Sequence, residues 1–236
     1  MTDRARLLLY CIADAAAALP SGGHGGGSGL LRIVHGGLAA VASPLAEPGR
    51  VEAPAKAELL EYERVIRAQH AVADVLPMRF GSVLSGEAAV RAHLDEQRET
   101  YQRALTRVAG CVELGVRALL SAPPPPTEPE TAVKPMRLSG AAWLEARRRH
   151  YSAESRLRDR CVALEQALVA KVAPLCREHR TEFPPPRPGE PALCSLYFLV
   201  PREQVLAFRA AVSSIPVESQ TDIALSGPWP PFNFVA

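Results

Sequence analysis

The chain has 236 residues, of which 47% are hydrophobic and 22% charged, a composition typical of a globular protein with a sizeable core. Its 27 basic and 25 acidic residues leave a formal net charge of +2, which gives no general reason to expect nucleic acid or an anionic membrane as partner. No uninterrupted apolar run approaches the roughly 18–20 residues that a membrane-spanning helix needs. We therefore expect a cytoplasmic protein with no nucleic acid and no membrane among its partners.

The first apolar run occupies residues 7–13. Arg4 and Arg6 precede it, as in a secretory signal, but the run is short and Asp14 interrupts it before the alanines that follow. Because the run is apolar on both faces, we expect a β-strand in the centre of a sheet.

A β-hairpin is expected next. Two short runs of β-type residues, 30–34 and 38–43, flank a turn at Gly36-Gly37. The glycine-rich segment before it, residues 21–29, lacks the Gly-Lys-Ser/Thr ending and the glycine spacing of phosphate-binding loops. We therefore interpret this segment as a surface loop and expect no nucleotide or other cofactor.

Two amphipathic helices and a strand follow. Apolar residues recur at helical spacing in residues 55–75, where Pro77 ends the pattern, and again in residues 87–108, where Gly110 is suited to a C-terminal cap. Residues 111–119 then alternate apolar side chains with others, which predicts a half-buried strand.

A proline-rich segment, residues 122–138, is the predicted boundary between two domains, because consecutive prolines favour an extended, semi-rigid spacer. The predicted domains are residues 1–121 and residues 139–236, each of α+β type. For the second domain the patterns predict, in chain order, a helix at residues 140–176, a strand at 192–200, a helix from Pro201 and a strand at 217–225.

No group of residues indicates a catalytic or metal site. The six histidines are dispersed, and none lies in a nucleophile motif. Cys176 and His179 have the spacing of metal ligands, but a structural zinc site needs four ligands, and Cys161 fits the buried stripe of its helix. We expect no bound metal. The five cysteines are scattered and odd in number, so we expect reduced thiols.

One basic cluster comprises residues 147–150 with Arg156, Arg158 and Arg160. It offers a site for nucleic acid or an acidic partner, but acidic residues interleave with it at three- and four-residue spacing. Aromatic side chains for base stacking are few. We interpret the cluster as a solvated helix face.

Two stretches are more specific than periodicity requires, LPMRFG after the first predicted helix and GPWPPF after the last predicted strand. Their residues are Leu76, Pro77, Met78, Arg79, Phe80 and Gly81, and Gly227, Pro228, Trp229, Pro230, Pro231 and Phe232. On these motifs the chain resembles the gas vesicle protein F/L (GvpL/GvpF) family. The segments at residues 111–117 and 141–147 agree with this resemblance, which extends over nearly the whole chain.

The resemblance implies an α+β protein of two domains with ferredoxin-like character, without catalytic activity. It implies an accessory protein needed for gas vesicle formation, and hence for buoyancy, that binds the hydrophobic shell protein and other gas vesicle proteins as an assembly factor. The alternative that it implies is a minor structural component on the gas-facing side of the shell. An assembly factor is physically sensible because a large apolar surface aggregates unless it is covered before assembly.

The role of each motif has two interpretations. Arg79 either holds its turn to a carboxylate or to carbonyl groups, or it contacts the shell protein directly. The prolines of the second motif are expected to end the last strand, because they cannot donate ladder hydrogen bonds. Trp229 and Phe232 then either dock the tail on a domain core or bind a partner.

Overall fold

The computed structural model describes residues 6–20, 29–45, 54–121, 140–184, 191–216 and 221–235, with the backbone only in residues 140–154. The chain divides into two compact units. The first unit comprises Met1–Glu113, Leu199–Arg202 and Gly227–Ala236, and the second comprises Leu114–Phe198 and Glu203–Ser226. The expected linker, residues 122–138, lies outside the described residues, and the domain ranges drawn from it remain a proposal.

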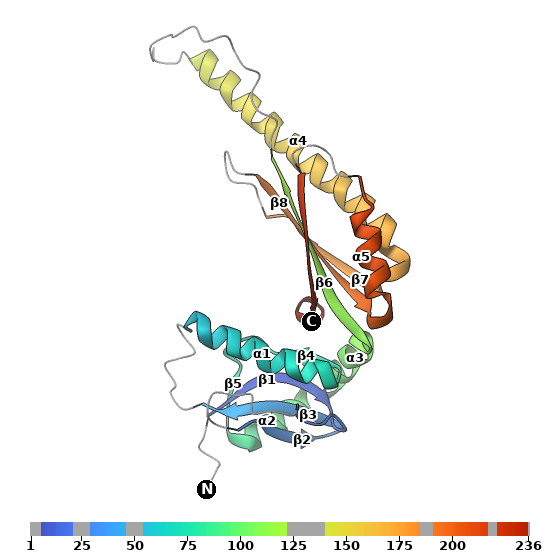
Figure 1. Cartoon of the computed structure of the whole chain (residues 1–236). Helices are drawn as coiled ribbons and strands as arrows, with labels where there is room; N and C mark the ends of the chain where they lie inside the picture. Colours follow the sequence, from blue (N-terminus) through green and yellow to red (C-terminus); the bar gives the residue numbers. More distant parts are fainter. Residues whose placement is uncertain are drawn as a thin grey trace. The chain divides into compact units, whose positions relative to one another are not determined.

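The first unit is built on a five-stranded sheet with β1 at its centre (Figure 1). Its strands are β1 (Arg6–Asp14), β2 (Leu31–His35), β3 (Leu38–Pro44), β4 (Val75–Pro77) and β5 (Val83–Ser85). β1 pairs antiparallel with β3, with β4 and with β5, and β2 forms an antiparallel hairpin with β3. The central strand predicted at residues 7–13 is confirmed. The hairpin is confirmed too, and Gly36 and Gly37 both have the positive φ that its turn requires.

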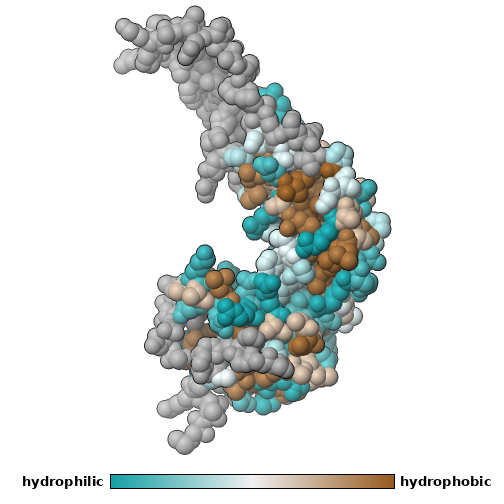
Figure 2. Space-filling view, in the orientation of Figure 1, coloured by the Kyte–Doolittle hydropathy of each residue, from teal (hydrophilic) through white to brown (hydrophobic). Residues whose placement is uncertain are grey.

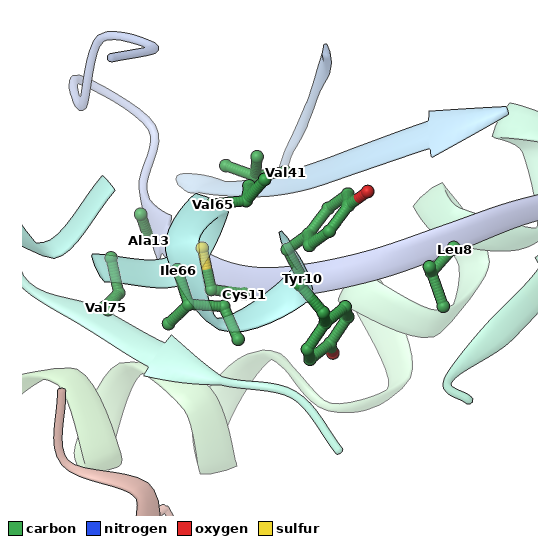
Figure 3. Close-up of a cluster of buried hydrophobic side chains, with 9 residues drawn as sticks. Leu8, Tyr10, Cys11, Ala13, Val41, Val65, Ile66 and Val75 are labelled. Atoms are coloured by element: carbon green, nitrogen blue, oxygen red, sulfur yellow. The ribbon is translucent and has the colours of Figure 1, made fainter. Parts of the chain in front are cut away.

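Three helices belong to the first unit: α1 (Lys56–Val72), α2 (Gly86–Glu96) and α3 (Arg98–Val108). α1 buries Val65 and Ile66 in one cluster with Tyr10 and Cys11 of β1, as Figure 3 shows. Burial raises the pKa of the Cys11 thiol well above its ordinary value, so the side chain packs there as a small apolar group.

The prediction of one helix at residues 87–108 is wrong, because the chain breaks at Gln97 into α2 and α3. The Gln97 N–H donates to the His93 carbonyl at 3.0 Å, and its own carbonyl accepts from the Tyr101 N–H at 2.9 Å. Apolar residues keep helical spacing across the break, which is why the sequence reads as a single helix. α1 also ends before residue 75, since β4 pairs with β1 from Val75 onward.

Gly110 follows α3 as the predicted cap. Its φ of +67° lies in the left-handed region, which suits glycine after a helix end. The Gly110 N–H donates to Asp74 Oδ2 at 2.9 Å, and the Gly110 carbonyl accepts from the Arg202 N–H at 3.0 Å. This residue therefore turns the chain from α3 into the next strand while both its backbone polar groups stay hydrogen-bonded.

The second unit has the element order βαββαβ. Its elements are β6 (Cys111–Leu120), α4 (Gly140–Val172), β7 (Glu178–Glu182), β8 (Ala192–Pro201), α5 (Val205–Ser213) and β9 (Thr221–Trp229). The strands are ordered β7-β8-β6-β9, the arrangement of a ferredoxin-like sheet (Figure 1). The predicted α+β class with ferredoxin-like character is confirmed. Short 3₁₀ turns lie at Ala173–Leu175, Arg202–Gln204 and Phe232–Phe234.

Two boundaries and one strand in this half of the chain differ from expectation. α4 ends at Val172 rather than at residue 176, because a 3₁₀ turn containing Pro174 replaces its last turn. β7 escapes the pattern-based prediction because its sequence, EHRTE, has no apolar side chain. β9 does not end before the second motif but continues through Pro228, which an edge strand tolerates. Residues 217–220 of the predicted last strand lie outside the described residues.

The core of the second unit lies between its sheet and its two helices. Phe198 of β8 is fully buried, with its ring centroid 5.1 Å from that of Phe208 on α5 and 6.0 Å from that of His179 on β7. Leu168 and Val172 of α4 are also fully buried. The amphipathic stripe predicted for the C-terminal half of this helix therefore faces the core.

Gly110 allows a test of the backbone requirement alone. A Cβ atom at Gly110 would meet nothing within 4 Å, so Gly110→Ala adds no steric clash and tests only the left-handed φ. We expect it to lower the free energy of unfolding by about 1 kcal/mol in urea denaturation. Gly29→Ala is the matched control, since Gly29 has equally open space and no left-handed φ. Equal stability of the two variants would contradict the role given to Gly110.

Candidate functional site

The first motif forms the connection between β4 and β5 and stays attached to β1. Leu76 and Pro77 are buried in β4. The Met78 N–H donates to the Tyr10 carbonyl at 2.8 Å, and the Leu9 N–H donates to the Ser82 carbonyl at 2.9 Å. The intervening residues therefore bulge out of an otherwise continuous antiparallel pairing with β1.

The bulge is closed by a tight turn between Arg79 and Ser82. The Ser82 N–H and hydroxyl both donate to the Arg79 carbonyl, at 3.1 and 2.8 Å. Gly81 has a φ of +93°, a conformation that side chains with a Cβ rarely adopt. The glycine of the motif is thus required by the turn geometry.

Tyr62 of α1 holds this turn to the sheet. Its hydroxyl lies 2.7 Å from the Leu9 carbonyl and 2.9 Å from the Met78 carbonyl and donates towards both. The Tyr62 ring stacks on Tyr10 at 4.9 Å between centroids and receives Phe80 edge-on at 5.0 Å. Burial raises the pKa of the Tyr62 hydroxyl well above its ordinary value, so the group remains a donor.

The side chain of Arg79 does not lock the turn, which was one of the two interpretations of this residue. Its side chain is exposed, and it makes no ion pair or side-chain hydrogen bond with the part of the chain that the structure describes. Tyr62 and Ser82 perform the locking instead, because they reach the carbonyls of the turn from α1 and from within the turn itself. The motif thus presents an exposed guanidinium on a rigid support.

The second motif begins within the last residues of β9, and its residues belong to the first unit, as α1 does. The Arg67 guanidinium carbon lies 4.6 Å from the centroid of the Trp229 ring, a cation–π contact, and Glu63 lies 3.4 Å from the same guanidinium. Pro230 and Pro231 are buried. The tail is therefore docked within the first unit, as one of the two interpretations required.

Phe234, rather than Phe232, is the aromatic residue that anchors this tail. Phe234 is fully buried, whereas 37% of Phe232 is exposed. The Asn233 N–H and side-chain amide donate to the two carboxylate oxygens of the buried Glu113, at 2.8 and 2.7 Å, and Arg107 donates to the Phe234 carbonyl. The sequence analysis did not identify this buried pairing; the one acidic residue in the apolar β6 sequence CVELGVR is the signal that could have indicated it.

A third link within the first unit joins Arg202 to the C-terminal end of α1. Arg202 donates to the His70 carbonyl at 2.8 Å, and the same nitrogen lies 3.2 and 3.3 Å from the two ring nitrogens of His70. Asp74 lies 3.8 Å from Arg202. Burial, and then the charge of Arg202, lower the pKa of His70 to about 4. Nothing in the sequence pattern indicated this cluster.

The other side chains considered for metal binding or catalysis are the cysteines and His179. No group of three potential metal ligands occurs among the residues whose positions are described. Cys176 is half-buried, and the His179 ring packs on Phe198. Burial raises the pKa of the Cys176, Cys161 and Cys194 thiols, the last to about 12, which lowers their reactivity at neutral pH.

The basic cluster is described only in part, because the side chains of residues 147–150 lie outside the described residues. Arg160 donates to the Ser121 carbonyl at 3.0 Å and to the Thr221 hydroxyl at 3.1 Å. This arginine therefore links α4 to the second sheet. Among the helices as described, none is long and apolar enough to cross a membrane.

The chain is similar to gas vesicle proteins over almost its full length. Residues 6–236 match the family described as gas vesicle synthesis protein GvpL/GvpF. Gas vesicle protein F of a Streptomyces species is 32% identical, with 86% of each chain covered, and gas vesicle protein L of a Streptomyces species is 30% identical, with 99% of this chain and 93% of the relative covered. The crystal structure of gas vesicle protein GvpF from Anabaena sp. has a TM-score of 0.76 at 20% identity, covering 98% of this chain and 96% of that one. This structure supports the fold alone.

Tyr62→Phe tests the role of the hydroxyl in the first motif. The change keeps the ring stacking but leaves two carbonyls without their donor, one of them in a buried hydrogen bond. We expect the free energy of unfolding to fall by about 1–3 kcal/mol, measured by urea denaturation. Tyr101→Phe is the control, since its hydroxyl bonds His93 on a neighbouring helix and not the turn. A Tyr62→Phe variant as stable as the wild type would contradict the role of this hydroxyl.

His70 makes stability depend on pH. Its pKa is about 4 in the folded chain and about 6.5 in an unfolded one, so only the unfolded chain takes up this proton between those values. The contribution of His70 to the free energy of unfolding is therefore fully present above pH 6.5. It is lost as the pH falls towards 4, and the total loss is about 3 kcal/mol. Thermal unfolding of the wild type and of His70→Gln should converge towards pH 4, and a constant difference between them would contradict this assignment.

Proposed function

Since the chain belongs to the gas vesicle synthesis protein GvpL/GvpF family, we propose that it is a cytoplasmic accessory protein that binds the hydrophobic shell protein and other gas vesicle proteins during vesicle formation. The role is that of an assembly factor and involves no catalysis. It covers apolar surface of the shell protein before that surface is buried in the growing shell.

The location of the binding surface is inferred from Arg79, which is exposed on a turn held by hydrogen bonds. A turn that is tied to β1 by backbone bonds, closed by Ser82 and capped by the Tyr62 hydroxyl has little freedom left to lose on binding. An exposed arginine on such a turn, with no ion pair in the described part of the chain, is suited to a partner's carbonyl or carboxylate groups.

Two apolar side chains belong to this turn and to the helix that supports it. Phe80 of the same turn is half-buried against Tyr62, and Leu59, three residues before Tyr62 on α1, is 42% exposed. The neighbouring Leu60 is 52% exposed. We define Leu59, Arg79 and Phe80 as the docking patch. Figure 2 shows hydrophobic residues interspersed with hydrophilic ones on the face in view.

The balance of forces on the docking patch predicts the effect of salt. Burial of Leu59 and Phe80 does not depend on ionic strength, whereas an exposed ion pair is screened within about 8–10 Å at physiological salt. Binding of the shell protein therefore persists at high salt. Binding through the basic face of α4 would instead weaken steeply with salt.

Arg79→Ala tests the docking patch. Because Arg79 supports no described part of the fold, the variant should unfold within about 0.5 kcal/mol of the wild type. We expect its affinity for freshly diluted shell protein to fall about tenfold, measured by co-purification, because the partner group loses its only cation at the patch. Arg103→Ala is the matched control, an exposed arginine on α3 that should keep both properties.

Two outcomes would contradict the proposal. If a stable Arg79→Ala variant binds the shell protein with the same affinity as the wild type, the docking patch is excluded. A wild-type protein that neither co-purifies with the shell protein nor slows its aggregation, at low and high salt, would exclude the assembly role. Washing purified vesicles in strong denaturant separates the remaining alternative, since a structural component of the shell stays with the vesicles and an assembly factor does not.

A further inference from the structure

The second sheet ends in two edge strands of different character. β7 and β9 are the outer strands of the order β7-β8-β6-β9. β7 is short and carries charged or titratable side chains at four of its five positions, the usual protection against pairing with another chain. β9 has nine residues and one charged side chain, Asp222. Only β9 therefore offers a long edge with little charge to oppose pairing.

The exposure along β9 agrees with an open edge. Asp222, Ala224 and Ser226 are exposed, and Ile223 and Leu225 between them are half-buried. Ser226 donates to the Gly115 carbonyl of the adjacent β6 at 3.3 Å, so the exposed set lies on the same face as this contact. Within the part of the chain that the structure describes, β6 is the one strand paired with β9.

The sequence of β9 is complementary to itself in an antiparallel arrangement. If two copies of β9 pair about a two-fold axis through Ala224, then Ala224 faces Ala224, Ile223 faces Leu225 and Asp222 faces Ser226. Apolar side chains meet apolar side chains on one face of the sheet, and each carboxylate meets a hydroxyl rather than another carboxylate. No like charges lie opposite each other, an arrangement that would destabilise the pairing.

From this complementarity we propose that β9 is a homodimerisation strand, which pairs antiparallel with β9 of a second copy of this chain and joins two four-stranded sheets into one. The paired segment ends at Gly227, because Pro228 has no N–H to donate. A two-fold interface of this kind uses the same surface on both copies. The proposal stands independently of the proposed role in gas vesicle formation.

The contact is short, so the dimer should form in a concentration-dependent way. Seven residues from each copy bury less surface than the roughly 1,200 Å² of a specific stable interface unless neighbouring groups add to it. The expected behaviour of the full chain is a reversible monomer–dimer equilibrium rather than a permanent dimer. Sedimentation velocity over a wide concentration range should show the average mass rising towards twice the monomer mass.

Introducing a charge at Ala224 tests the register of the β9–β9 pairing directly. Because Ala224 faces itself across the axis, Ala224→Lys places two ammonium groups opposite each other, and Ala224→Glu places two carboxylates opposite each other. Each variant alone should dimerise at least about tenfold more weakly than the wild type. An equimolar mixture of the two variants should recover dimerisation, since every Lys then faces a Glu. Ala71→Lys, the same change at an exposed position of α1, is the matched control and should dimerise normally.

The mixture separates loss of pairing from misfolding, because two misfolded variants would not regain dimerisation when mixed. Recovery in the mixture supports β9 pairing about Ala224. A wild type that stays monomeric at every concentration overturns the proposal, as does a wild-type dimer that neither variant weakens. If the wild type is monomeric and Ala224→Lys instead loses co-purification with the shell protein, the edge receives another partner and the dimer is excluded.

Discussion

The Tyr62 hydroxyl is the interaction on which the candidate docking surface depends. It lies within hydrogen-bond distance of a carbonyl on β1 and a carbonyl of the LPMRFG turn, and its ring fills the space between Tyr10 and Phe80. One side chain of α1 therefore sets the position of the turn relative to the sheet. Without it, the bulge between β4 and β5 would keep its two backbone bonds to β1 but lose its contact with the helix.

The residues that support the turn differ from the residue that it exposes. Tyr62, which ties the turn to the sheet, is buried, and the exposed Arg79 side chain makes no ion pair or hydrogen bond among the described residues. Such a division reduces the entropy cost of binding, because the guanidinium is carried by a backbone that is already ordered. In the second motif the buried residues instead serve attachment to the first unit, namely Pro230 and Pro231, together with Phe234 just after the motif.

The two compact units are interleaved in sequence. Residues 199–202 and 227–236 belong to the first unit although the strands that lead to them belong mostly to the second. Each return is secured by a charged group whose partners lie within the first unit: Arg202 at the His70 carbonyl, and Glu113 at the backbone and side chain of Asn233. Charge-assisted hydrogen bonds are stronger than neutral ones, and the carboxylate of Glu113 is in addition buried. The chain crosses between its units several times.

The sequence by itself determined the features that depend on neighbouring residues. Apolar runs and alternation located the central strand, the hairpin and β6, helical spacing located α1, and Gly110 marked the end of α3, because each reflects local periodicity or backbone preference. The two motifs also identified the family. Only the tertiary structure decided which distant side chains meet in the first unit: Tyr62 meets Leu9 across 53 residues, Asn233 meets Glu113 across 120, and Arg202 meets His70 across 132. No local pattern encodes such separations, since what selects Phe234 over Phe232 as the anchor, and leaves Arg79 exposed, is the shape of the space that distant elements enclose.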